Sequence, residues 1–313
     1  MIYVTGDTHG GSDIKKLVSR KVTDTLTKED TLMICGDFGF IWDTKKEARK
    51  EKTWLDWFAD MPWTTIFADG NHECFPRLFT YPEEVRYGGH VHVIRRNLYH
   101  AMRGEVFTIE GKKIFVMGGA SSHDRGPAAG NTKAVIGKYW WPEELPSEEE
   151  FRNAENHLDA CSRHVDLIIT HCLPSSLQHE LKHGTYPSDC LTKYLEKVMH
   201  TVSYEKWYCG HYHCDLDLEN NISVLFKKVL PAGSTVINSD PIPGSAIYQR
   251  GDELLFLLDG HEEHGIIRAI YPWGMLKIKD EPCYDIEIAD TGKTVKYVRE
   301  SSIIRFIRKG KDS

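Results

Sequence analysis

Short apolar runs alternate with amphipathic segments over most of the 313-residue chain, and this alternation is typical of an α/β protein. The apolar runs are too short for isolated helices and suit buried strands. They predict strands over 2–5, 31–35, 64–68, 105–109, 113–117, 167–170, 206–209 and 224–230. Amphipathic segments predict helices over 12–19, 45–59, 147–160 and 188–199, and the third begins with a capping-box pattern formed by Ser147 and Glu150.

The pattern changes after the turn-rich stretch at 240–244, which contains two prolines and a glycine. Beyond it no helical periodicity is present, and the chain carries β-type runs separated by turn signals. We therefore predict a main domain over 1–245 and a small, barrel-like β module over 246–313. The alternative is that some of these strands complete the main sheet. The runs are 254–258, 266–271, 275–278, 284–288 and 303–307.

Composition narrows the class of protein. Hydrophobic residues make up 41% and charged residues 27% of the chain, as in ordinary soluble domains. The formal net charge of −7 gives no global attraction to nucleic acid or to anionic membranes. No apolar run approaches the roughly 18 residues of a membrane span, and the N-terminus does not have the pattern of a signal peptide. The eight scattered cysteines form no CxxC pair, so we expect reduced thiols in a cytoplasmic protein.

Five of the apolar runs end in clusters of acidic, amide or imidazole side chains. Because strands of an α/β sheet deliver residues at their carboxyl ends into one crevice, we expect these clusters to lie together. Each cluster alone is weak evidence, since such residues are common in turns. The clusters are Asp7-Thr8-His9, Gly36-Asp37, Gly70-Asn71-His72-Glu73, His171 and Gly210-His211-Tyr212-His213.

These residue types predict a site for divalent transition metals. Asp, Asn and neutral His suit Mn, Fe or Zn without any cysteine, and we take Mn²⁺ as the first expectation. Asp37 can bridge two ions because a carboxylate has two oxygens. Asp7 and His9 are separated by one residue, as are His211 and His213, so each pair faces one way while the chain stays extended. The preceding glycines permit tight turns at the strand ends.

In this order the clusters resemble the motifs of the calcineurin-like metallophosphoesterase family, which are Asp-x-His, Gly-Asp, Gly-Asn-His-Glu, His and Gly-His-x-His. The motifs span residues 5–213, and the resemblance covers roughly the first 245 residues. It implies a hydrolase of phosphoric esters, built as a two-sheet β-sandwich flanked by helices with the site at the edge of the sheets. It also implies one ion held by Asp7, His9, Asp37 and His213 and a second held by Asp37, Asn71, His171 and His211.

The expected reaction is in-line attack on phosphorus by a hydroxide that bridges two metal ions, since such ions bind phosphate oxygens and acidify a shared water. No serine or cysteine nucleophile is then required. The Asn71 side chain is expected to stabilise charge on the phosphoryl oxygens. His72 adjoins a ligand without being one, and we predict that it protonates the leaving oxygen. The alternative is a histidine that only orients a ligand.

Two further regions are candidates for substrate contact. A glycine-led polar loop follows the run at 113–117 and carries His123 and Arg125. Arg125 is a candidate for a forked contact to the substrate phosphate, and His123 for an assisting role, with a solvated surface loop as the alternative. Trp42 and the aromatic segment 139–142 are candidates for a substrate rim.

The substrate is left open between phosphate monoesters and diesters. A small ester such as a nucleotide fits the acidic net charge better than a long nucleic acid does. A nuclease is an alternative, because five basic residues within 299–311 give the C-terminal module a local positive charge. A protein Ser/Thr phosphatase is disfavoured, since that branch has Asp-Arg-Gly shortly after Gly-Asp where Phe38-Gly39-Phe40 stands here. A catalytically inactive metal-binding scaffold is a third alternative, although every ligand position is filled.

Overall fold

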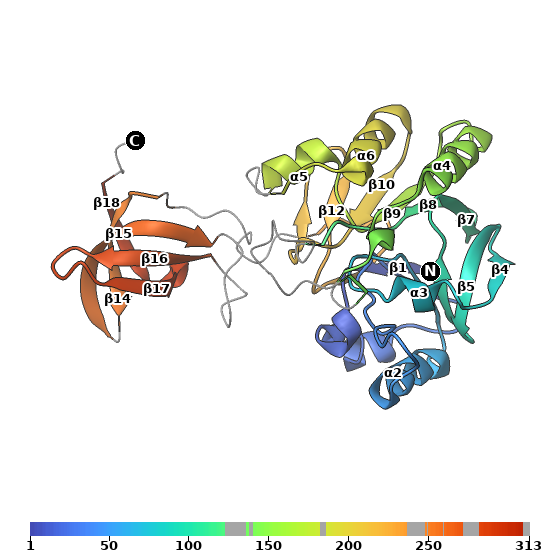
Figure 1. Cartoon of the computed structure of the whole chain (residues 1–313), viewed down its shortest axis with the longest axis horizontal. Coiled ribbons are helices and arrows are strands. Elements are labelled where there is room, and N and C mark those ends of the chain that lie inside the picture. The colour runs from blue at the N-terminus through green and yellow to red at the C-terminus, as the bar shows by residue number, and fades with distance from the viewer. Residues whose placement is uncertain are drawn as a thin grey trace. The chain divides into compact units, whose positions relative to one another are not determined.

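The chain folds into two compact units, Met1–Ile237 and Asn238–Ser313, each drawn in Figure 1. The computed structural model describes residues 1–122, 136–137, 140–181, 186–236, 248, 250–258, 260–271 and 282–308. The domain limit expected between residues 245 and 246 lies outside these described residues and stays a prediction. No helix within the described ranges has the length and apolarity that a bilayer crossing would need.

Two β-sheets form the centre of unit 1. In the described residues, one sheet has the strand order β13-β1-β2-β3-β6-β5-β4 and the other the order β11-β12-β10-β9-β8-β7. The first sheet consists of β1 (Ile2–Thr5), β2 (Thr31–Ile34), β3 (Thr64–Phe67), β4 (Glu83–Arg86), β5 (Gly89–Arg95), β6 (Leu98–Ala101) and β13 (Val229–Pro231). The second consists of β7 (Glu105–Ile109), β8 (Lys112–Met117), β9 (Leu167–Thr170), β10 (Lys206–Cys209), β11 (Leu216–Asp217) and β12 (Ile222–Val224).

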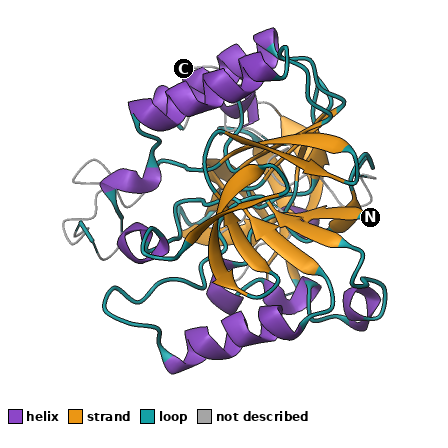
Figure 2. Cartoon of the chain, turned by 90° about the vertical axis from the view of Figure 1, so that its right-hand side faces the viewer, coloured by secondary structure: helices purple, strands orange, loops and turns teal. Residues whose placement is uncertain are grey.

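The two sheets pack face to face, and helices cover their outer faces (Figure 2). β2 shows why its sequence is a continuous apolar run: Met33 lies in the core between the sheets, whereas Leu32 and Ile34 lie in the core under the helices. Strands buried on both faces have no need of polar alternation. The helices are α1 (Arg20–Thr23), α2 (Arg49–Asp60), α3 (Phe75–Leu78), α4 (Glu148–Ala160), α5 (Ser175–Leu181) and α6 (Cys190–Thr201). The predicted fold class, an α/β two-sheet sandwich flanked by helices, is confirmed.

The start of α4 agrees with its sequence signal. Ser147 Oγ accepts a hydrogen bond from the Glu150 backbone N–H at 3.2 Å, and the Glu150 carboxylate accepts one from the Ser147 N–H at 2.7 Å. These bonds satisfy backbone donors that a helix start leaves without partners. α6 begins in a related way after Asp189, whose carboxylate accepts from Thr192 N at 2.8 Å.

Two predicted elements are wrong or incomplete, and others were missed. The helix expected over 12–19 is replaced by a 3₁₀ turn at Ile14–Lys16 followed by the short α1. The strand expected over 224–230 is two strands, because β12 belongs to the second sheet and β13 to the first. Strands β4–β6 were not predicted, and β4 is exposed along its whole length, so it lacks the apolar signal of a buried strand.

Unit 2 is an antiparallel sheet in the order β17-β16-β15-β14-β18, counted over its described residues. It has a core of its own that includes Leu254, Phe256, Ile267 and Tyr284. Its outer strands β17 and β18 pair with no further strand among the described residues, and the barrel-like closure stays a prediction. The run expected at 275–278 lies outside the described residues. The strands are β14 (Glu253–Leu258), β15 (His261–Tyr271), β16 (Cys283–Ile288), β17 (Thr294–Arg299) and β18 (Ile303–Arg308).

Candidate metal centre

The carboxyl ends of parallel strands from both sheets meet at one edge of the sandwich. β1, β2 and β3 are parallel neighbours in the first sheet, and β9 and β10 are parallel neighbours in the second. Each of these strands is followed within a few residues by a member of one polar set, which we call the ligand cluster. The ligand cluster consists of Asp7, His9, Asp37, Asn71, His171, His211 and His213.

Three overlapping groups of side chains in this region have their potential ligand atoms within 4.8 Å of one another. The groups are Asp7, His9 and His213; His9, Asp37 and His72; and Asp37, His171 and His211. His9 is common to the first two groups and Asp37 to the last two, and Asp37 Oδ2 lies 3.1 Å from His9 Nε2 while its Oδ1 lies 3.2 Å from His171 Nε2. One carboxylate therefore offers an oxygen to each of two adjacent positions.

Buried polar atoms without partners show that these residues fit metal ions. Asp7 Oδ2, Asn71 Oδ1 and His171 Nε2 are buried and have no hydrogen-bond partner among the described residues. An unsatisfied buried polar atom costs about 1–3 kcal/mol of stability, so three of them in one cluster require an explanation. Two carboxylates, an amide oxygen and imidazole nitrogens are oxygen and nitrogen donors suited to divalent transition metals.

The backbone of the ligand cluster is held in unfavourable conformations. His9, Asp37, His211 and His213 have positive φ angles of 44°, 47°, 67° and 54°. Non-glycine residues rarely adopt this region, and such strain tends to persist where function requires it. The turn glycines matter mainly through close contact: a Cβ atom on Gly36 would lie 2.1 Å from His171 Nδ1.

Further contacts orient the imidazoles of the ligand cluster. His9 Nδ1 lies 2.8 Å from Asp13 Oδ2, and His171 Nδ1 lies 2.8 Å from the Cys35 carbonyl oxygen. Because each Nδ1 then carries the proton, each Nε2 is left to face the carboxylates. The Lys16 ammonium group donates to the backbone carbonyls of Gly6, Asp7 and Phe226, and so fixes the loop that carries Asp7.

The sequence comparisons agree with this geometry. A family model described as calcineurin-like phosphoesterase matches residues 1–215, which is more than half of the chain. The chain belongs to the calcineurin-like phosphoesterase family. This family consists of hydrolases that act on phosphoric ester bonds and depend on a binuclear metal centre. No curated protein matches the sequence.

One solved structure to which the chain is similar is that of a putative 5′-nucleotidase from Staphylococcus aureus in complex with α-ketoglutarate. The sequence identity is 16%, the match covers 72% of this chain, and the TM-score is 0.40. The present chain spans about half of that protein, with 48% of it covered.

The charges in this phosphoesterase site are strongly coupled. Burial alone would raise the pKa of Asp7, but the interaction with His213 and the charge of His171 outweigh it and lower that pKa to about 2. Burial likewise opposes the ionised form of Asp37, whose pKa the charge of His171 nevertheless holds well below its usual range. The carboxylates in turn outweigh the burial of the imidazoles and raise the pKa of His9 to about 10 and of His171 to about 9.

His72 and Glu73 differ from each other in role. The His72 side chain is 44% exposed, and its Nε2 lies 3.9 Å from Asp37 Oδ2, so it reaches both the site and solvent. Burial lowers the pKa of His72 despite the opposing charge of Asp37. Glu73 is fully buried and accepts from the Phe38 N–H at 2.7 Å, which fixes the loop after Asp37. Burial raises the pKa of Glu73 well above its usual value.

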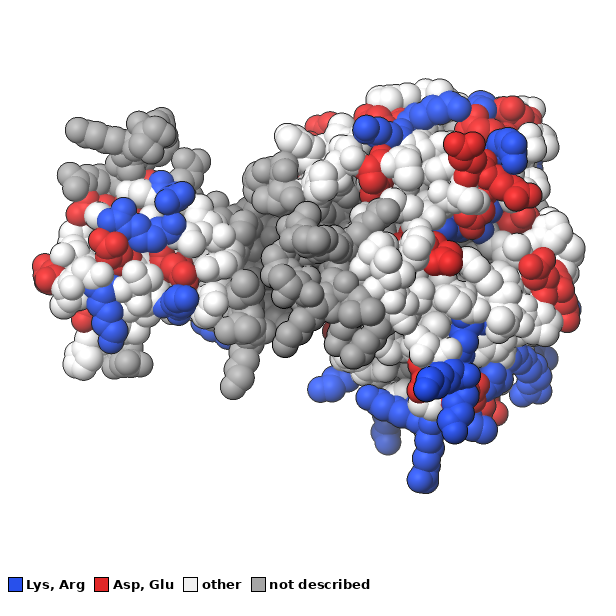
Figure 3. Space-filling model, in the orientation of Figure 1, with Lys and Arg blue, Asp and Glu red and all other residues white. Residues whose placement is uncertain are grey.

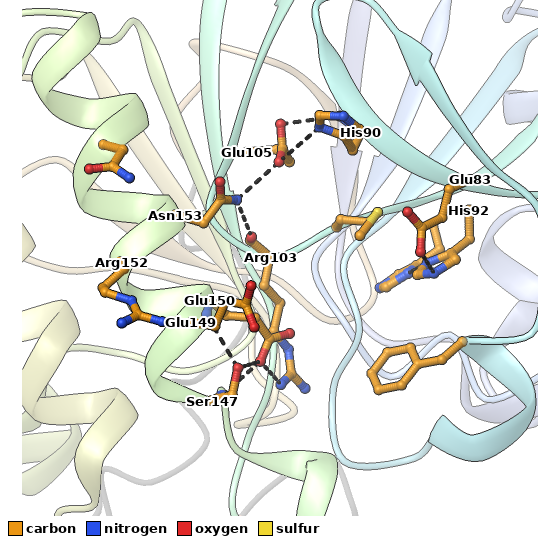
Figure 4. Close-up of a pocket in the computed structure, with 14 residues that line it drawn as sticks. Glu83, His90, His92, Arg103, Glu105, Ser147, Glu149, Glu150, Arg152 and Asn153 are labelled. Atoms are coloured by element: carbon orange, nitrogen blue, oxygen red, sulfur yellow. Dashed lines mark hydrogen bonds and ion pairs between the residues drawn. The ribbon is translucent and has the colours of Figure 1, made fainter.

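A separate cavity of about 680 Å³ lies between strands β4–β7 and the start of α4 (Figure 4). No member of the ligand cluster lines it. At its wall, His92 Nδ1 lies 2.9 Å from His100 Nδ1, and His100 Nε2 lies 3.1 Å from Asp69 Oδ1. We call His92 and His100 the β5–β6 histidine pair. Arg103 also contacts Asp69, through its Nε at 2.9 Å.

The structure brings together every predicted ligand and His72, whereas His123 and Arg125 lie outside the described residues. Sequence reasoning missed Asp13 and Lys16. Asp13 stands four residues after His9, a spacing that places two side chains near each other on a helical turn. Lys16 offered no such signal, because its ammonium group contacts backbone carbonyls that come together only in the fold.

Proposed function

We propose that the protein hydrolyses a small phosphate mono- or diester with two divalent transition metal ions bound by the ligand cluster. The observation that carries this proposal is the set of buried atoms Asp7 Oδ2, Asn71 Oδ1 and His171 Nε2, which have no hydrogen-bond partner in the described residues. The first ion is assigned to Asp7, His9, Asp37 and His213, and the second to Asp37, Asn71, His171 and His211.

The protein residues have distinct tasks in this proposal. The ions would supply positive charge to the phosphate oxygens and lower the pKa of the attacking water. Asp37 sets the spacing of the two ion positions, because its Oδ2 lies next to His9 and its Oδ1 lies next to His171. Its own orientation is fixed, since Oδ1 accepts from the Asn71 and His72 N–H groups at 2.8 and 2.9 Å.

His72 is the proposed general acid. Its backbone is anchored to Asp37 while its ring reaches solvent, as a residue that protonates a leaving group requires. Since its pKa is lowered, the protonated fraction decreases as pH rises through that value. Turnover of esters with poor leaving groups therefore falls with rising pH, whereas activated aryl esters are less affected.

We propose Mn²⁺ as the metal, with Fe and Zn as the ions that the same donors accept. The eight cysteines, all within the described residues, form no disulfide, which supports a reducing cytoplasmic location. The test is reconstitution of the metal-free protein with each ion. Elemental analysis should give two ions per chain, and the loaded protein should hydrolyse p-nitrophenyl phosphate or bis-p-nitrophenyl phosphate. Protein that binds no transition metal under these conditions would contradict the proposal.

One observation favours a second candidate function, a nuclease. Lys45, Lys46, Arg49, Lys50 and Lys52 are exposed at and before the start of α2, and positive side chains gather over this part of unit 1 in Figure 3. A basic surface on the unit that carries the site favours a polyanion. For a nuclease, oligonucleotide hydrolysis should exceed mononucleotide hydrolysis and fall steeply with salt, and a Lys46→Glu/Lys50→Glu variant should reduce it. Equal rates for oligonucleotides and mononucleotides exclude this function.

A further inference from the structure

Trp42 is the only exposed tryptophan among the seven that the structure describes, with 38% of its surface accessible. Its neighbours Phe40 and Ile41 are buried in the core beside α2. The same short loop therefore buries two apolar side chains and leaves the largest one in solvent. Exposing an indole forgoes the favourable burial of a large apolar surface, so its position calls for a ligand.

The exposed indole lies directly beside the catalytic side of the site. Its ring centroid is 5.9 Å from that of His72, with an angle of 29° between the ring planes. The same imidazole reaches the metal centre, because its Nε2 lies 3.9 Å from Asp37 Oδ2. Trp42 and the carboxylate shared by the two ion positions therefore both lie beside His72. A leaving group that takes a proton from His72 then lies beside the ring that Trp42 stacks on.

The backbone on both sides of Trp42 is fixed. The Ile41 carbonyl accepts from the Cys74 N–H at 2.7 Å, and the Asp43 carbonyl accepts from Arg77 Nη1 at 2.7 Å. Both partners belong to α3 or to the residue before it. An exposed side chain on a fixed backbone is pre-organised, so less conformational entropy is lost when a ligand binds to it.

A second tryptophan supports the indole from the side. Trp141 is 2% exposed, and its ring meets that of Trp42 edge-on at a centroid distance of 5.3 Å. The Trp141 backbone N–H donates to Glu144 Oε1 at 3.3 Å, and the Glu144 carbonyl accepts from Ala120 N at 3.1 Å. Trp141 is therefore tied to the loop after β8, and its ring packs against that of Trp42.

We propose that Trp42 is a stacking platform for the base of a nucleoside phosphoester, an inference that rests on the proposed function. In a nucleoside phosphoester the sugar lies between the phosphate and the base. When the leaving oxygen is at His72, the planar base therefore extends past His72 to the Trp42 indole. In an aryl phosphate the ring is attached to the leaving oxygen itself and remains at His72. Stacking on tryptophan accepts any base, because every base has a flat face. The exposed Lys45 and Lys46 nearby suit an anionic ligand.

The test compares adenosine 5′-monophosphate with ribose 5-phosphate, which differ only in the base, and includes their methyl esters in case the enzyme takes only diesters. We expect the wild-type protein to have a higher kcat/KM for the adenosine compound. Trp42→Ala should decrease the ratio of the two kcat/KM values by about ten-fold or more, mainly through KM. Trp42→Phe should restore part of the ratio. Tyr87→Ala, which removes an exposed aromatic side chain on the β4–β5 turn, should leave the ratio unchanged.

The outcomes separate this proposal from the proposed function. An equal decrease for both compounds in Trp42→Ala, or no change in either, would overturn the stacking role. Wild-type protein that hydrolyses aryl phosphates but neither member of the pair would also overturn it while leaving the phosphoesterase function intact. Metal-loaded protein without activity on any phosphoester would overturn both. Thermal unfolding of Trp42→Ala near the wild-type temperature shows that a lower ratio does not come from misfolding.

Discussion

Unit 1 contains two buried sets of histidines whose surroundings differ. In the ligand cluster, His9 and His171 direct one ring nitrogen to a protein acceptor and the other toward the carboxylates. In the β5–β6 histidine pair, His92 and His100 direct ring nitrogens to each other. His171 follows β9, whereas His92 and His100 lie in β5 and β6, and all three side chains are buried, so burial alone does not distinguish the two sets.

The two sets of histidines differ in whether every hydrogen-bond acceptor has a donor. Asp69 is ionised because Arg103 outweighs the effect of burial and lowers its pKa, so His100 Nε2 donates to it. His100 Nδ1 must then accept from His92 Nδ1, and this chain of hydrogen bonds is complete without a cation. The ligand cluster has no such solution, because Asp7 Oδ2, which lies 3.3 Å from His213 Nε2, and Asn71 Oδ1 accept no hydrogen bond in the described structure. A metal site is therefore recognised by acceptors that the protein leaves unsatisfied rather than by the number of histidines.

The largest expected effect comes from removing the carboxylate that connects the two ion positions. Asp37→Asn should lose metal binding and reduce hydrolysis by about a thousand-fold or more, because the shared ligand holds both ions. Elemental analysis and a phosphatase assay measure the two effects. His92→Gln is the matched control in the β5–β6 pair and should retain both ions. Equal metal loss in the two variants would remove the distinction between the two sets of histidines.

His72 tests whether a histidine within the site acts without binding metal. His72→Gln should keep both ions and lower kcat for alkyl esters by about 10²–10⁴-fold, the usual contribution of a general acid. The loss should be much smaller for p-nitrophenyl esters, whose leaving group needs no proton. A uniform loss across leaving groups, accompanied by lost metal, would instead identify His72 as a residue that orients a ligand.

Much of the fold follows from the sequence because buried strands carry a strong signal. Leu32, Met33 and Ile34 make both faces of β2 apolar. Apolar runs of this kind predicted where the strands end, and the site residues follow those ends. β4 gave no signal because all of its residues are exposed. The spacing of Ile14, Leu17 and Val18 suggested a helix, but Lys16 is tied to carbonyls of Gly6 and Phe226 instead, so tertiary contacts overrode the local pattern.

The candidate site, like the fold, could be predicted only in part from the sequence. The metal-ligand types and their places after strands can be predicted from the sequence, because each motif is local. Contacts between distant segments cannot be predicted in this way. The fixed backbone around Trp42 depends on Cys74 and Arg77, and the orientation of His171 depends on the Cys35 carbonyl.

Carboxylates beside the two sets of histidines should differ in importance. Asp13 orients His9 through Nδ1, so Asp13→Asn should weaken metal binding about 10–100-fold, as expected for a residue that positions a ligand. Glu83 lies 3.8 Å from His92 Nε2, and Glu83→Gln should leave metal affinity unchanged. Titration of the metal-free proteins with Mn²⁺ gives both dissociation constants. An unchanged affinity in Asp13→Asn would show that the His9 ring is fixed by packing alone.

The smallest effect concerns the stability of the β5–β6 pair in acid. Burial, followed by the charge of His100, lowers the pKa of His92 to about 3, whereas an unfolded histidine has a pKa of about 6.5. The unfolded chain therefore binds the extra proton as pH falls between these values, and the native state loses up to about 1.4 kcal/mol per pH unit. His92→Gln removes this term. Urea denaturation measures the unfolding free energy of wild type and variant. The difference between the two should be constant above about pH 6.5. Below that pH, the unfolding free energy of the wild type should decrease relative to that of the variant. Parallel curves at all pH values would show that His92 accepts a proton as readily in the fold as in the unfolded chain.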